Sequence, residues 1–182
     1  MDKPSPKRLF IGLPLTPSTN RALDKYCREI STQYPSLKIR FTPATKRHLT
    51  LAFLGSLNIA QIQNAVSIVE TLKHSAFTLQ LESISRFPEQ QSRIIAALPK
   101  ASKMLNSLHN KLHSALKTQG LPTTERPFRP HISLARIKYM ENNLPLTLNP
   151  PVEMKVSEII LYESLLTDTG SIYTPIEIND LS

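Results

Sequence analysis

Two near-identical tetrapeptides, His48-Leu49-Thr50-Leu51 and His131-Ile132-Ser133-Leu134, stand 83 residues apart in a chain of 182 residues. Each alternates polar and apolar side chains with a period of two, which is the pattern of a half-buried β-strand. The spacing is too long for a solenoid repeat. It predicts one unit over residues 1–182 with two related lobes, each of which contributes one strand to a shared cleft.

Apolar periodicity predicts further elements around these two strands. Helices are expected over 17–33, 58–73 and 102–119, and strands over 8–15, 37–41, 48–54, 77–87, 93–98 and 131–137. Loops are expected at 121–130 and 142–151, Gly55 is expected to stop a strand, and 152–165 should form a hairpin with 172–178. This order of elements predicts an α+β fold with antiparallel strands and helices packed outside.

In each tetrapeptide the histidine and the hydroxyl residue share one face of the strand. Residues i and i+2 of a strand point to the same side, so His48 lies with Thr50 and His131 lies with Ser133. The anchors of each pair stand ~6.6 Å apart at the usual rise per residue, which is enough to flank one phosphate. We therefore expect four polar groups to converge on one tetrahedral anion.

These groups suit the opening of a cyclic phosphodiester. One imidazole would take a proton from the attacking water and the other would protonate the leaving ribose oxygen, roles that fit the histidine pKa of ~6.5. Hydroxyls and an arginine would bind the phosphate oxygens. Because a histidine base would already activate the water, neither a metal nor a cofactor is expected. A single such tetrapeptide is more often an ordinary polar strand position, but two copies favour catalysis. A zinc site is the main chemical alternative, although the sequence offers no cysteine or carboxylate ligand set beside the histidines.

Longer segments around both tetrapeptides resemble a known family. Residues 47–55 (RHLTLAFLG) and 128–136 (FRPHISLAR) are similar to the paired motifs of the two-histidine (2H) phosphoesterase superfamily. Within that superfamily the similarity is to the RNA 2',3'-cyclic phosphodiesterases, also called 2'-5' RNA ligases. Segments 8–15 and 161–173 resemble the same family, so the resemblance spans nearly the whole chain.

The resemblance implies a bilobal fold with pseudo-twofold symmetry, in which antiparallel sheets flank a central cleft and helices lie outside. It implies that His48 is the general acid toward the leaving O3' and that His131 is the general base on water, which would give a 2'-phosphate. Arg136, five residues after His131, would bind the phosphate together with Thr50 and Ser133. The implied activity is that of an RNA 2',3'-cyclic 3'-phosphodiesterase.

The chain departs from the family pattern at two positions. Ser133 stands where threonine is usual, and Phe41 stands where tryptophan is often found ahead of the first motif. Phe41 and Phe128 are expected either to stack on a terminal base or to pack in the core. Arg47 and Arg129 are expected either to contact the RNA backbone or to be solvated.

The formal net charge of +8 favours an anionic partner, with nucleic acid first among the candidates. Basic residues cluster beside both tetrapeptides, at Lys38, Arg40, Lys46, Arg47, Arg126, Arg129, Arg136 and Lys138. We expect RNA ends with a 2',3'-cyclic phosphate as the substrate, bound by a monomer, with ligation as the reverse reaction. The alternatives are a 2'-5' oligoadenylate or an ADP-ribose cyclic phosphate as substrate, or an RNA-binding protein whose activity is lost or incidental.

Other features favour ordinary structural roles. The lone Cys27 fits a buried helical thiol, and the N-terminal segment lacks a signal-peptide pattern, so a reducing cytoplasmic location is expected. No segment approaches the ~20 apolar residues of a membrane span. His109 and His113 lack a third ligand and are expected to form a polar helix edge, whereas His74 should end a helix as a cation.

Overall fold

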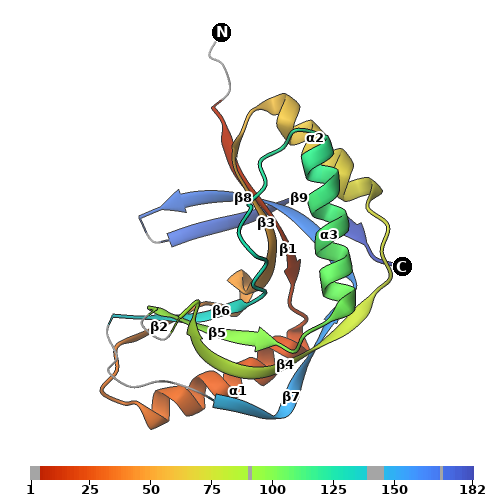
Figure 1. Ribbon diagram of the computed structural model, residues 1–182. Coiled ribbons are helices and arrows are strands. Elements are labelled where there is room, and N and C mark those ends of the chain that lie inside the picture. Colours follow the sequence, from red (N-terminus) through yellow and green to blue (C-terminus); the bar gives the residue numbers. More distant parts are fainter. Residues whose placement is uncertain (1–4, 90–91, 139–145, 169) are drawn as a thin grey trace.

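The computed structural model describes residues 5–89, 92–138, 146–168 and 170–182 (Figure 1). These ranges contain three α-helices, a 3-10 turn and nine strands. Their order is β1 (Lys7–Pro14), α1 (Pro17–Gln33), β2 (Ile39–Phe41), the 3-10 turn (Ala44–Lys46), β3 (His48–Leu57), α2 (Ile59–Thr71), β4 (Phe77–Phe87), β5 (Ile94–Pro99), α3 (Lys103–Thr118), β6 (Ile132–Ile137), β7 (Leu146–Val156), β8 (Glu158–Thr167) and β9 (Gly170–Asp180). None of the helices described is long and apolar enough to cross a membrane.

The strands form one antiparallel sheet in the order β7-β4-β5-β6-β3-β1-β8-β9, and β2 pairs with the C-terminal part of β6. Two halves of this sheet meet at its centre, where β3 and β6 are joined through the pair Leu49 and Ile132. The two central strands carry the two tetrapeptides and occupy equivalent places in their halves. The α+β class and the antiparallel pairing are therefore confirmed, and the strand order has the predicted twofold character.

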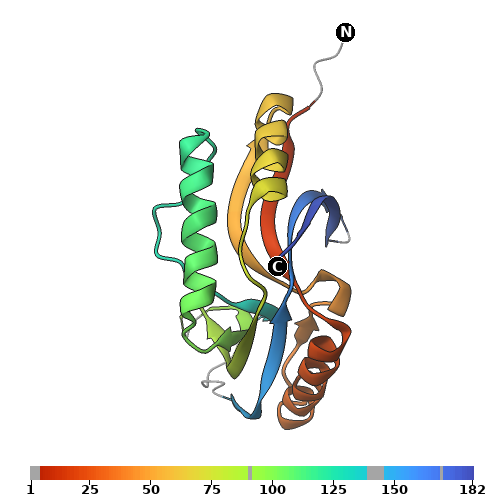
Figure 2. The same cartoon turned by 90° about the vertical axis from the view of Figure 1, so that its right-hand side faces the viewer.

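Amphipathic helices cover the outer side of the sheet. Helix α3 buries Leu105, Leu108, Leu112 and Leu116 along one stripe, and Ser102 caps its start by accepting from the Leu105 amide. Helices α2 and α3 lie together on one side of the molecule, whereas α1 lies beside β7 (Figures 1 and 2). The β8–β9 hairpin points away from α3, toward the side of the molecule where β2 and β6 end (Figure 1).

One loop prediction and one strand prediction in the last third of the chain are wrong. The segment expected as a loop at 142–151 is strand from Leu146 onward, while 139–145 lie outside the described residues. Prolines are tolerated there because β7 is the edge strand of the sheet. The single strand expected over 152–165 is two strands separated at Ser157, because β7 pairs with β4 whereas β8 pairs with β1.

Two smaller expectations also fail. Gly55 does not stop β3, which continues to Leu57. Gly55 has a φ of 67° and lies beside a β-bulge. His74 does not end a helix, because α2 ends at Thr71. It is buried beyond α2, its Nδ1 lies 2.9 Å from the Ser75 carbonyl oxygen, and its ring packs edge-on against Phe77.

Candidate active site

One cavity of about 580 Å³ at the centre of the sheet contains all five residues predicted to act on the phosphate. His48 and Thr50 come from β3, Ser133 and Arg136 come from β6, and His131 immediately precedes β6. The strand register explains why these side chains meet. Because Leu49 pairs with Ile132 in an antiparallel ladder, His48 lies across from Ser133 and Thr50 lies across from His131.

Equivalent β-bulges in β3 and β6 bring a further side chain onto the cavity face. The register of β3 against β1 skips Leu51, and the register of β6 against β5 skips Leu134. An extra residue shifts the alternation of faces by one place. The fifth residue after each histidine, Phe53 in β3 and Arg136 in β6, therefore lines the cavity together with that histidine. Strict alternation alone would have placed Arg136 on the opposite face from His131.

Each imidazole is oriented by a carbonyl two residues earlier in the chain. His48 Nδ1 lies 2.9 Å from the Lys46 carbonyl oxygen, and His131 Nδ1 lies 3.0 Å from the Arg129 carbonyl oxygen. A carbonyl can only accept, so Nδ1 carries the proton in both rings. Nε2 is then the ring nitrogen available for proton exchange with a bound molecule in each case.

Aromatic rings enclose His48 on the β1 side. Its ring centroid lies 4.7 Å from that of Phe10 and 5.2 Å from that of Tyr173, which meets it edge-on. Gly12 lies next to this ring. A Cβ there would lie 3.4 Å from His48 Cδ2, which is an ordinary contact distance, and 3.2 Å from the Leu49 carbonyl oxygen, which is unusually close. Glycine thus permits a close approach of the β1 backbone to the residue after His48.

His131 rests on an aromatic ring from the other half of the sheet. Phe87, at the end of β4, stacks on it with a centroid distance of 3.9 Å. Arg129 covers Phe87 in turn, with its guanidinium carbon 5.2 Å from the ring centroid, and donates from Nη2 to the Pro88 carbonyl at 2.6 Å. Arg129 therefore supports the ring beneath His131.

The surroundings lower the pKa of both histidines from the ordinary value of 6.5. Desolvation is the main cause for each ring, because burial disfavours the imidazolium. The hydrogen bond from Nδ1 to the carbonyl opposes this decrease, whereas His131 lowers the pKa of His48 further and Arg129 lowers that of His131. Desolvation also raises the pKa of the neighbouring Tyr162 to about 12.

The charged side chains that line the cavity are cationic: Arg8, Lys46 and Arg136. Among the residues that the structure describes, no aspartate or glutamate belongs to this lining. Hydroxyl groups of Thr42, Thr50, Ser133, Ser164 and Ser171 add neutral donors. A site of this composition suits an anion with several oxygen atoms.

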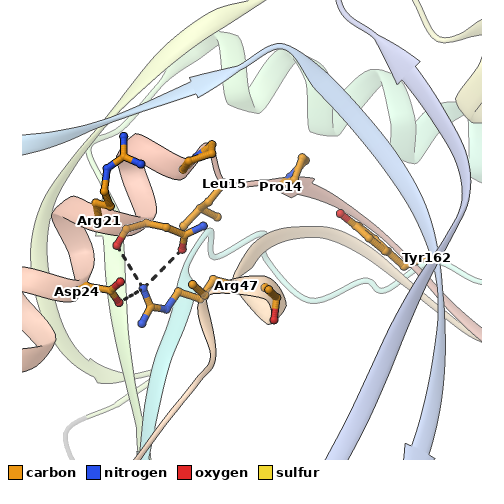
Figure 3. Close-up of a pocket in the computed structure, with 10 residues that line it drawn as sticks. Pro14, Leu15, Arg21, Asp24, Arg47 and Tyr162 are labelled. Atoms are coloured by element: carbon orange, nitrogen blue, oxygen red, sulfur yellow. Dashed lines mark hydrogen bonds and ion pairs between the residues drawn. The ribbon is translucent and has the colours of Figure 1, made fainter.

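Among the expected RNA contacts, Arg47 and Phe41 stand outside this cavity. Arg47 is buried, and its guanidinium pairs with Asp24 of α1 beside a different pocket (Figure 3). Phe41 is partly buried and packs against the core. This placement favours core packing for Phe41. Arg47 is not solvated, as the alternative expectation had it, because its guanidinium is buried and paired with Asp24.

Phe128 also lies outside the cavity lining. It stacks on His109 at 3.9 Å, which gives it a packing role on α3. His109 and His113 do not belong to a group of three or more candidate metal ligands among the described residues. Burial raises the pKa of the Cys27 thiol, which fits the structural role expected for it.

The phenylalanine and tyrosine side chains of the cavity lining were not singled out from the sequence. Their signals are weak because each is an ordinary strand residue taken alone: Phe10, Phe53, Phe87 and Tyr173. One of them had a usable signal, because Phe53 stands five residues after His48, just as Arg136 follows His131.

Known proteins are similar to this chain in both sequence and fold. A model of the 2'-5' RNA ligase superfamily matches residues 19–168, which include both tetrapeptides. The chain is 30% identical over 177 residues to the RNA 2',3'-cyclic phosphodiesterase of Escherichia coli strain K12, covering 94% of this chain and 95% of that relative. It is 27% identical over 189 residues to the protein of the same name from Aquifex aeolicus strain VF5, covering 93% and 95%. The crystal structure of E. coli LigT in apo form has a TM-score of 0.80 at 26% identity, over 98% of this chain and 99% of that one.

Proposed function

We propose that this chain, which belongs to the 2'-5' RNA ligase superfamily, hydrolyses 2',3'-cyclic phosphates at the ends of RNA. The observation that carries the proposal is the pair of imidazoles in one cationic cavity, each with Nδ1 bound to a backbone carbonyl. Two such rings supply the base and the acid that hydrolysis of a phosphodiester needs. The names of the relatives agree with this activity.

The reaction is an in-line displacement at phosphorus. His131 Nε2 accepts a proton from water as the water oxygen bonds to phosphorus, and protonated His48 Nε2 donates a proton to O3' as the P–O3' bond breaks. A 2'-phosphate and a free 3'-hydroxyl result. The two histidines have then exchanged protonation states, and solvent restores them before the next turnover.

The remaining cavity side chains bind the substrate. Thr50 and Ser133 donate to the non-bridging oxygens, and Arg136 neutralises the negative charge that the phosphate carries. The extra cations Arg8 and Lys46 suit the neighbouring phosphates of an RNA chain. Bound phosphate raises the depressed pKa of the histidine that must be protonated, because opposite charges favour the imidazolium.

The test uses a short RNA that ends in a 2',3'-cyclic phosphate, incubated with the purified protein in excess EDTA and followed by phosphorus NMR. We expect conversion to a 2'-phosphomonoester. A 3'-phosphate would reverse the assigned roles of His48 and His131. Binding without any conversion would contradict the proposed function and favour an RNA-binding protein. Hydrolysis of a 2'-5' oligoadenylate or an ADP-ribose cyclic phosphate alone would assign a different phosphodiester to the same cavity.

A further inference from the structure

Arg47 is a buried cation that the proposed reaction does not use. Its side chain is only 4% exposed, and its Nη1 lies 2.8 Å from Asp24 Oδ1 of α1, whose side chain is 39% exposed. Nη1 also lies 3.5 Å from the backbone and side-chain oxygens of Asn20. Figure 3 shows Arg47 and Asp24 facing each other at a pocket of about 400 Å³ on α1. A buried guanidinium needs such partners, because desolvation of an unpaired charge is costly.

These contacts hold the short segment that leads into His48. Arg47 Nε donates to the Thr42 carbonyl at 3.1 Å, where the segment begins. Backbone hydrogen bonds then close a 3-10 turn at 44–46. The carbonyl of Lys46, the last residue of that turn, is the group that accepts from His48 Nδ1. The Arg47 side chain, which holds the start of this segment, is thus linked through the turn to the Lys46 carbonyl that orients the His48 imidazole.

We propose that Arg47 is a positioning residue for His48, acting through the Lys46 carbonyl, with Asp24 as its anchor on α1. The inference rests on the proposed function only for the role given to His48. The segment before His131 is organised differently. There Pro127 and Pro130 restrict the backbone, and the side chain of Arg129 is exposed.

The proposal has a consequence for proton binding at His48. The hydrogen bond to the Lys46 carbonyl raises the pKa of His48 against the larger effect of desolvation. Loss of a fixed carbonyl therefore lowers this pKa further, and the limb of the pH profile that belongs to His48 moves to lower pH. The titratable and charged side chains that pack against His48 or share its cavity are Arg8, Lys46, His131, Arg136, Tyr162 and Tyr173.

The test replaces Arg47 with methionine, which keeps an unbranched side chain but removes the charge. Asp24→Asn is the milder companion variant, because Asp24 is partly exposed and its loss leaves the packing intact. Lys7→Met is the matched control, since it breaks a different ion pair, 2.8 Å long with Glu163, far from the turn. For each protein we would measure kcat, KM, the pH profile, and the pKa and tautomer of His48 by NMR of the labelled imidazole.

For Arg47→Met we expect kcat to fall roughly tenfold to a hundredfold with a much smaller change in KM, as for a misplaced reacting group. The His48 limb and the NMR pKa should move to lower pH, and the NMR signals should indicate a mixture of ring tautomers. Asp24→Asn should change the same quantities less, and Lys7→Met should change none of them.

A lower unfolding temperature with unchanged kcat and an unchanged His48 pKa would overturn the proposal. If Arg47→Met does not fold, the same criteria apply to Asp24→Asn. The NMR measurement needs no substrate, so failure of the proposed function is distinguished from failure of this inference.

Discussion

At the scale of single residues, Gly12 lets β1 approach the backbone of Leu49, the residue after His48. A Cβ at position 12 would stand 3.2 Å from the Leu49 carbonyl oxygen, closer than side chains normally approach backbone oxygen. We expect Gly12→Ala to shift Leu49, and with it the neighbouring His48, and to lower kcat about tenfold or more, with little change in KM. Steady-state kinetics, with a thermal unfolding curve to establish folding, would check this. Unchanged kcat in a folded variant would show that the contact is relieved elsewhere.

Phe53 is the aromatic side chain best placed to contact a nucleobase. It is 66% exposed although it lines the cavity, so its ring can accept a stacked partner. We expect Phe53→Ala to weaken substrate binding by ~1–3 kcal/mol, as for loss of one stacked base, and to raise KM accordingly. A ribose 2',3'-cyclic phosphate without a base should not respond to the change. Phe41→Leu is the control, and a larger effect at Phe41 than at Phe53 would contradict the assignment.

At the scale of elements, the end of β4 supports the second histidine. The Phe87 ring stacks on His131, whereas Phe77 at the start of the same strand packs on the buried His74. We expect Phe87→Leu to lower kcat roughly tenfold or more by loosening His131. Phe77→Leu removes a comparable ring contact and should affect only the unfolding temperature. Equal effects of the two variants on kcat would assign Phe87 to general stability.

Most elements could be predicted because local signals and tertiary packing agree in them. The ranges expected for α1 and β4 match the structure to the residue, since Thr16 caps one and regular alternation defines the other. β7 could not be predicted, because tolerance of Pro150 and Pro151 depends on its place at the sheet edge. The break at Ser157 likewise depends on a change of pairing partner that no local pattern reports.

The part of the site that lies within the two tetrapeptides could be predicted from the sequence. His48, Thr50, His131 and Ser133 follow from strand alternation, and all four line the cavity. Arg136 required the family resemblance, because a bulge at Leu134 overrides the alternation. The supporting rings could not be predicted from the residues alone, since Phe10, Phe87 and Tyr173 reach the histidines from strands that are distant in the chain.

At the scale of the whole molecule, the two halves of the sheet place two histidines with lowered pKa values in one cationic cavity. One ring must be neutral and the other protonated, so kcat/KM should be bell-shaped. Because kcat/KM reports the free enzyme, its maximum should lie below pH 6.5. The maximum of kcat should lie at higher pH, because bound phosphate stabilises the imidazolium. A kcat/KM profile that is flat or keeps rising above pH 6.5 would contradict this electrostatic account.

The central claim is that His48 and His131 act as one acid–base pair across the two halves. The most direct measurement is kcat for hydrolysis of a 2',3'-cyclic phosphate by His48→Ala, His131→Ala and the double variant, with His113→Ala on α3 as the control. Each single change should lower kcat by about 10²–10⁴-fold, as for loss of a general acid or base. The kcat of the double variant should be only slightly lower than that of the less active single variant, because the effects of residues that act as a unit are not additive. Near wild-type turnover in either single variant, with its fold intact, would contradict the claim.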